Sequence, residues 1–125
     1  AVGTEPARIA KTLSFMVGDT PTLVVLAGDA RVNNPAFKAT FHCKAKMLSA
    51  DQAAELVGHA VGGVCPFGVN DGVDVFLDES LRRFETVWPA AGSASSAIEL
   101  TLDELERFSG ARGWVDVAKG WREGE

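Results

Sequence analysis

The sequence predicts an α+β fold: a mixed, barrel-like β-sheet of about six or seven short strands with peripheral helices. Three observations lead to this prediction. Short alternating or apolar runs are separated by turn residues, helix caps occur between these runs, and the composition is 46% hydrophobic and 23% charged. The 125 residues show no internal repeat and no linker, so residues 1–125 are expected to form a single domain.

The first two strands are predicted to form a β-hairpin. Residues 8–17 end in an alternating pattern that places Lys11 and Phe15 on one strand face. Residues 18–21 have turn chemistry, and residues 22–27 form an apolar run rich in β-branched side chains.

Three helices are predicted from their capping residues. Asn34 offers an N-cap and Pro35 fits the first helical position, so a short helix is expected to end at Phe41. Two capping boxes predict the other helices, and a glycine stops each of them: the boxes are residues 49–52 and 101–104, and the stops are Gly58 and Gly110.

The remaining strands are predicted from short apolar runs, at residues 44–48, 73–77, 84–88, 97–100 and 113–117. One helical turn is expected over residues 78–83 and a loop over residues 89–96. The charged tail from Ala118 to Glu125 is expected to fray.

The charge is uneven along the chain. The net charge is −5, but residues 1–46 carry +3 and residues 47–125 carry −8. One face could therefore meet a nucleic-acid backbone, although an uneven solvated surface gives the same count. No run reaches the ~20 apolar residues of a membrane helix, no charged-then-apolar pattern at the start predicts a signal peptide, and two cysteines do not make a disulfide scaffold. A cytoplasmic protein without a membrane partner is expected.

The glycine-rich segment at residues 58–68 is the most informative stretch. Its four glycines and its proline favour a stiff loop of exposed backbone N–H groups, which suits an oxyanion or a carbonyl. The alternative is a tight connection between a helix and a strand.

Two ionisable side chains stand out beside this loop. Lys11 shares its strand face with Phe15, so its ammonium either points to a cavity mouth, where it would hold a phosphate or a reacting carbonyl, or extends to water. Asp78 follows a strand, where it either caps the next helical turn or lines a site.

The cysteines allow two further hypotheses. Hydrolysis by Cys65 needs a base, but neither His42 nor His59 has a sequence context that places it beside the thiol. A metal site formed by His42, Cys43, His59 and Cys65 would lack the close paired spacing of zinc sites. No cofactor and no metal are expected.

Several motifs together resemble the YbaK/prolyl-tRNA-synthetase-associated domain family, over roughly residues 8–117. In chain order they are Lys11-Thr12-Leu13, Gly62-Gly63-Val64-Cys65-Pro66-Phe67-Gly68, residues 76–81, Ala91-Gly92-Ser93 and Ile98-Glu99-Leu100. The resemblance implies the barrel-like α+β fold and trans-editing, the hydrolysis of the ester bond of mischarged aminoacyl-tRNA, of the tRNA-Pro type.

The resemblance also implies roles for single residues. Lys11 and Gly63 would be catalytic, and the substrate-binding residues would be Gly62, Val64, Cys65, Pro66 and Asp78. The partners would be the 3′ end of a mischarged tRNA and a synthetase. The alternative is a non-catalytic module that binds tRNA ends or a synthetase.

The chain departs from the family pattern at two places. Family members have a helix and a strand before the Lys11 segment, and this chain begins too late to contain all of them. Cysteine-specific members carry a serine where this chain has Ala90, which puts a cysteinyl substrate in doubt. The sequence determines neither the amino acid removed nor the oligomeric state.

Overall fold

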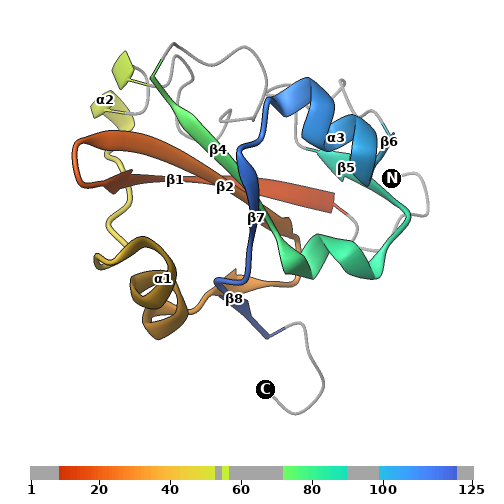
Figure 1. The fold of residues 1–125 in the computed structure, drawn as a ribbon, viewed down its shortest axis with the longest axis horizontal. Helices are drawn as coiled ribbons and strands as arrows, with labels where there is room; N and C mark the ends of the chain where they lie inside the picture. Colours follow the sequence, from red (N-terminus) through yellow and green to blue (C-terminus); the bar gives the residue numbers. More distant parts are fainter. Residues whose placement is uncertain (1–8, 53–54, 57–71, 90–98, 121–125) are drawn as a thin grey trace.

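Six strands form one mixed sheet, in the order β6-β5-β1-β2-β4-β7, in a computed structural model that describes residues 9–52, 55–56, 72–89 and 99–120 (Figure 1). The strands are β1 (Ile9–Val17), β2 (Thr20–Ala27), β4 (Asp74–Asp78), β5 (Thr86–Pro89), β6 (Leu100–Thr101) and β7 (Gly113–Val115). A second sheet pairs β3 (Arg31–Val32) with β8 (Ala118–Lys119).

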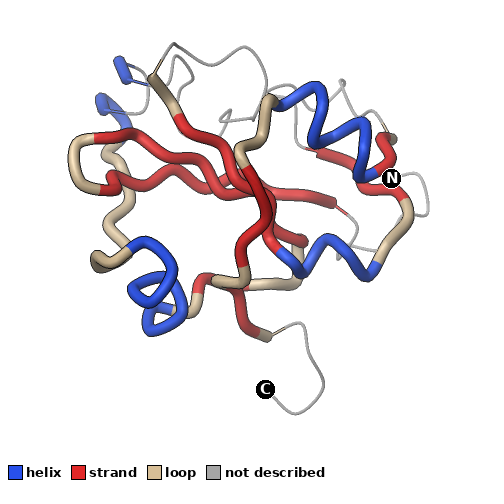
Figure 2. The backbone as a smooth tube through the Cα atoms, in the orientation of Figure 1, coloured by secondary structure: helices blue, strands red, loops and turns tan. Residues whose placement is uncertain are grey.

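The helical elements lie at the margins of the strands (Figure 2). They are α1 (Asn34–Phe41), α2 (Ala50–Gln52), the 3₁₀ helix η3 (Glu79–Arg83) and α3 (Leu102–Ser109). The predicted α+β class, with a curled mixed sheet and peripheral helices, is confirmed.

The hairpin of β1 and β2 is the centre of the main sheet. The two strands are antiparallel, and a two-residue turn at Gly18 and Asp19 joins them, as the register of Val17 opposite Thr20 shows. Strand β5 joins β1 and strand β4 joins β2, both in parallel orientation, while β6 runs antiparallel to β5. The predicted hairpin is therefore confirmed, and the sheet grows outward from it.

The core is thickest around β2. All five residues from Leu23 to Ala27 have no exposed surface, so both faces of this strand are covered. On one face, aromatic rings of β1, α1 and β4 form a continuous row. Successive centroids lie 4.8, 4.6 and 5.2 Å apart along Phe15, Phe37, Phe41 and Phe76, within the range at which aromatic pairs stabilise a core.

Both predicted capping boxes are present. In the first, the Ser49 N–H donates to Gln52 at 3.0 Å, and the Gln52 N–H donates to the Ser49 hydroxyl at 3.2 Å. The box at residues 101–104 has the same reciprocal bonds, and α3 ends at Gly110 with a φ of 66°. The predicted stop at Gly58 lies outside the described residues.

The cap of α1 is one residue earlier than predicted. The side chain of Asn33, not Asn34, accepts a hydrogen bond from the Ala36 N–H at 3.2 Å. Because both asparagines precede Pro35, the sequence alone did not distinguish between two adjacent residues with the same capping ability.

Two predictions, one of a strand and one of a frayed tail, were wrong. Residues 44–48 form only an isolated bridge, between Met47 and Phe15, because this polar segment contributes a single buried side chain, Leu48, to the core. The tail does not fray at its start: Ala118 is 4% exposed and pairs with β3 through β8. Here burial in the core holds a segment that its sequence marks as an exposed end.

Candidate active site

Strand pairing places Lys11 near the end of the sheet where β1 begins and β2 ends. Lys11 lies opposite Leu26, and residues opposite each other in an antiparallel pair share a face. Lys11 is also on the same face of β1 as Phe15, which packs against Phe37 of α1. The half-buried side chain therefore belongs to the covered face of the sheet, at its margin.

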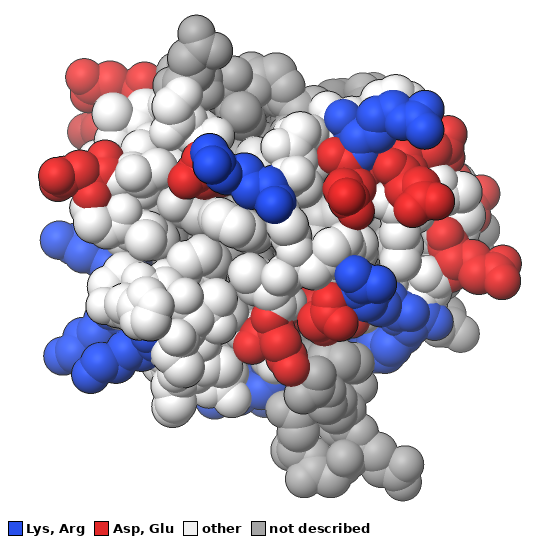
Figure 3. Space-filling view, in the orientation of Figure 1, with Lys and Arg blue, Asp and Glu red and all other residues white. Residues whose placement is uncertain are grey.

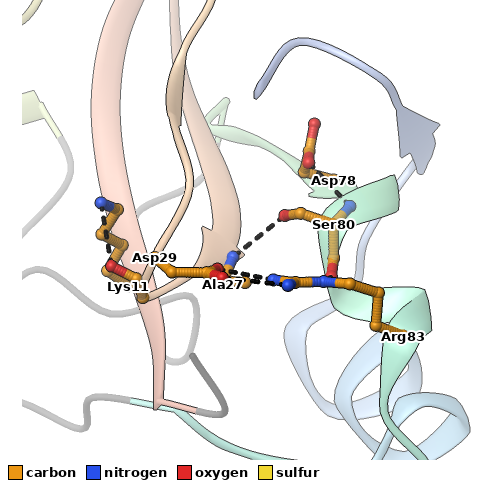
Figure 4. Close-up of polar contacts among 7 residues, drawn as sticks. Lys11, Ala27, Asp29, Asp78, Ser80 and Arg83 are labelled. Atoms are coloured by element: carbon orange, nitrogen blue, oxygen red, sulfur yellow. Dashed lines mark hydrogen bonds and ion pairs between the residues drawn. The ribbon is translucent and has the colours of Figure 1, made fainter. Parts of the chain in front are cut away.

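The Lys11 ammonium lies against the turn that follows β2. Its Nζ donates to the backbone carbonyl of Gly28 at 3.5 Å, which is a long hydrogen bond (Figure 4). Burial lowers the pKa of Lys11 from its ordinary value; the Asp29 carboxylate opposes this lowering, and the charge of Arg31 adds to it. The structure thus holds a partly desolvated cation beside a fixed backbone carbonyl.

Asp29 is the negative charge that acts on Lys11. Hydrogen bonds from Arg83 hold the pKa of Asp29 below its usual value, so this carboxylate is ionised at neutral pH. Sequence reasoning missed both residues as parts of the site. The dipeptide Gly28-Asp29 directly after a buried strand was a usable turn signal for Asp29, whereas nothing in the sequence points to Arg83.

Asp78 is fully buried at the end of β4. Its two carboxylate oxygens accept 2.8 Å hydrogen bonds from the backbone N–H groups of Ser80 and Val117. Burial raises the pKa of Asp78, and these two hydrogen bonds oppose the rise. The predicted cap of a helical turn is therefore observed, whereas a role in substrate binding stays a prediction.

Lys11 and Asp78 lie at the same end of the sheet without contact. Leu26 of β2 lies opposite Lys11 of β1. The preceding residue of β2, Val25, is in register with Leu77 of β4, so Asp78 falls in the same row across the sheet as Leu26 and Lys11. Two strand spacings separate β1 from β4, about 10 Å. Lys11 and Asp78 thus share one end of the sheet, with Leu26 between them.

The glycine-rich loop was predicted to supply the other half of the site. Its residues Gly62, Gly63, Val64, Cys65 and Pro66 lie outside the described residues. Their roles, and the question of a thiol nucleophile, stay predictions.

A second feature is a pocket of about 480 Å³ beside the start of α1, lined by Asn34, Pro35, Lys38, Lys44 and Ala45. Both lysines are exposed. In Figure 3 the charged side chains next to α1 are basic, whereas acidic side chains lie at the upper left and, together with basic ones, over α3. The first turn of α3 contains Asp103 and Glu104, and its last turn contains Arg107.

Across the described part of the chain, no group of three His, Cys, Asp or Glu is placed to hold a metal ion. Nor does any helix described there have the length and apolar character needed to span a membrane.

One protein family matches most of the length of the chain. The chain belongs to the aminoacyl-tRNA editing domain family, whose model matches residues 1–108. Its function therefore lies in the editing of aminoacyl-tRNA.

The chain is also similar to several individual proteins. The chain is 51% identical over 121 residues to the uncharacterized protein YwhH of Bacillus subtilis, covering 96% of this chain and 77% of that protein. It is 24% identical to a proline–tRNA ligase of Lactiplantibacillus plantarum, covering 88% of this chain but only 19% of the ligase. A crystal structure described as a candidate trans-editing enzyme for prolyl-tRNA synthetase superimposes with a TM-score of 0.85 at 29% identity, over 95% of this chain and 75% of that one.

Proposed function

We propose that this protein is an aminoacyl-tRNA deacylase that acts in trans on mischarged tRNA, with the tRNA of proline as its first candidate. The observation that carries the proposal is the Lys11 ammonium, half-buried at the margin of the sheet, in a chain of the aminoacyl-tRNA editing family. The similarity to proline–tRNA ligases supports the choice of tRNA.

The reaction is the hydrolysis of an ester. Water adds to the ester carbonyl, the bond from the acyl carbon to the ribose oxygen breaks, and the products are a free amino acid and a tRNA with a free hydroxyl. Because the ester is already activated, holding it in place and stabilising the oxyanion can suffice without a side-chain nucleophile.

Lys11 and the glycine-rich loop divide this task in the proposal. The ammonium of Lys11 faces the terminal phosphate or the ester region of the tRNA, while backbone N–H groups of residues 62–66, Gly63 above all, hold the ester. Cys65 and Pro66 act through the shape of this loop. The loop assignment derives from the sequence motif alone.

The need for such an enzyme follows from the limits of binding selectivity. A hydrophobic pocket separates amino acids that differ by one methylene by only about 1–3 kcal/mol, so a second site must remove wrong products. Only the single-stranded end of the tRNA has to enter that site, which is compatible with a protein of net charge −5.

The test is the release of amino acid from a panel of mischarged tRNAs, with wild type, Lys11→Ala and Lys119→Ala compared. We expect a loss of roughly 100-fold or more for Lys11→Ala, the scale of removing one well-placed donor, and no loss for Lys119→Ala, which removes an exposed charge from β8. Since burial disfavours the Lys11 charge, thermal unfolding should show that Lys11→Ala stays folded.

Two outcomes would change the assignment. Full activity of Lys11→Ala would remove this lysine from the mechanism. Saturable binding of tRNA by the wild type, with no amino acid released from any member of the panel, would favour the non-catalytic binding module.

A further inference from the structure

The turn that receives the Lys11 ammonium is itself held from another part of the chain. Arg83 of η3 forms a two-pronged ion pair with Asp29, Nη1 to Oδ2 at 2.9 Å and Nη2 to Oδ1 at 2.5 Å. These residues are 54 positions apart in the sequence. Figure 4 shows the guanidinium reaching from η3 to the turn beside Lys11.

The Arg83 guanidinium is held by η3 as well as by Asp29. Its Nε donates to the backbone carbonyl of Ser80 at 3.0 Å, which orients the guanidinium within η3. The Ser80 hydroxyl in turn accepts a 3.1 Å hydrogen bond from the N–H of Ala27, the last residue of β2. Two contacts therefore tie η3 to the segment that ends β2 and forms the turn, and one of them is buried.

We propose that Asp29 and Arg83 are positioning residues for Lys11: Arg83 holds the Asp29 carboxylate, and the held carboxylate keeps the Gly28 turn in place beside the ammonium without forming an ion pair with it. The proposal rests on the function proposed above, in which Lys11 acts on the tRNA ester. A carboxylate paired with Lys11 would neutralise the charge that this function needs, and a turn without its ion pair would leave the ammonium less well placed.

The charges around Lys11 predict opposite shifts of its pKa for substitutions at Asp29 and at Arg83. Among the described residues, two charges act on its ammonium: Asp29 favours the protonated form, and Arg31 opposes it. Replacing Asp29 by Asn removes the favourable charge, so the pKa of Lys11 should fall. Replacing Arg83 by Gln releases Asp29 to approach the ammonium, so the pKa of Lys11 should rise.

The experiment measures kcat and KM for amino acid release with Asp29→Asn, Arg83→Gln and Arg83→Lys. We expect kcat to fall by about 10- to 100-fold with little change in KM, the usual effect of slight misplacement of a reacting group. Arg83→Lys should recover only part of this loss, because an ammonium cannot form the two-pronged pair.

Arg82→Gln is the matched control. Arg82 is the neighbouring arginine of η3, but its Nε pairs with Glu79 at 2.7 Å and its guanidinium lies 4.0 Å from the Trp114 ring centroid. This variant changes the same charge on the same element and should keep the wild-type kcat.

The second measurement does not depend on turnover. The rate at which acetic anhydride labels Lys11 is followed by mass spectrometry over a pH series, which gives the pKa of its amine in each variant. Opposite shifts for Asp29→Asn and Arg83→Gln would support the proposal. Wild-type kcat and wild-type labelling profiles in both variants would overturn it. If the wild type releases no amino acid from any mischarged tRNA, the proposed function fails, and the labelling profiles alone decide the positioning role.

Discussion

The carboxylate of Asp78 accepts a 2.8 Å hydrogen bond from the backbone N–H of Val117, 39 residues further along the chain. Its other oxygen accepts the N–H of Ser80 at the start of η3. One buried side chain thus joins the end of β4, the first turn of η3 and the segment that leads into β8. This contact also fixes the position of Ser80, whose hydroxyl receives the N–H of Ala27 at the end of β2.

Asp78→Asn is expected to destabilise the fold although it removes a buried charge. The amide would present an N–H₂ group to one of two N–H donors, leaving that donor buried and unpaired, at a cost of about 1–3 kcal/mol. Chemical denaturation measures the change. Glu79→Gln is the control, because its ion pair with Arg82 is exposed and contributes little.

The Asp78 substitution also has a defined pH dependence. Burial raises the folded-state pKa of Asp78, so between its ordinary value and the raised one the folded protein binds more protons than the unfolded chain. The stability of the wild type therefore falls as pH rises through that window, and Asp78→Asn does not titrate. The difference in the free energy of unfolding between the wild type and Asp78→Asn should narrow as pH rises over this range. A difference that widens would contradict a raised pKa of Asp78.

Thr12, next to Lys11 in the sequence, has a buried hydroxyl for which no partner exists among the described residues. Replacing it with Val removes an unsatisfied polar atom at nearly constant shape, so we expect Thr12→Val to stabilise the protein by up to about 1 kcal/mol. The midpoint of thermal unfolding measures the change.

A matched substitution gives the opposite expectation. The Thr22 hydroxyl is also buried, but it donates to the carbonyl of Thr20 at 3.2 Å. Thr22→Val therefore removes a satisfied bond and should destabilise the fold. Equal effects of Thr12→Val and Thr22→Val would show that hydrogen bonding does not decide the outcome at these positions.

Local signals predicted the elements that local chemistry controls. Both capping boxes and the stop at Gly110 were found because each requires only residues within one or two helical turns. The hairpin was found for the same reason: its strands are adjacent in sequence, and Gly18-Asp19 is a local turn.

Contacts between distant segments could not be predicted in the same way. The pairing of β3 with β8 joins two-residue strands that have no periodicity of their own, so the tail was expected to fray. The Arg83–Asp29 ion pair likewise depends on the parallel placement of β4 beside β2, which brings η3 next to the turn. Lys11 could be proposed as a site residue because its strand face and its motif are local, whereas the residues that hold the turn beside it come from elsewhere in the chain.

The lysines that line the pocket beside α1 give a prediction about how the tRNA docks. Lys38 and Lys44 are both exposed and line this pocket. Phosphate contacts release counterions, so each lysine that meets the tRNA backbone should add about 0.7–0.9 to the slope of log affinity against log salt concentration. The double variant Lys38→Ala/Lys44→Ala should therefore bind mischarged tRNA more weakly at low salt and show a slope shallower by about 1–2. The kcat of the double variant at saturating tRNA should match that of the wild type, because neither lysine lies on β1 or in the Gly28 turn that Lys11 contacts.

The control is Arg107→Ala, which removes a cation from α3 and should leave the slope unchanged. Equal slopes for the wild type and both variants would show that the tRNA approaches over a different face.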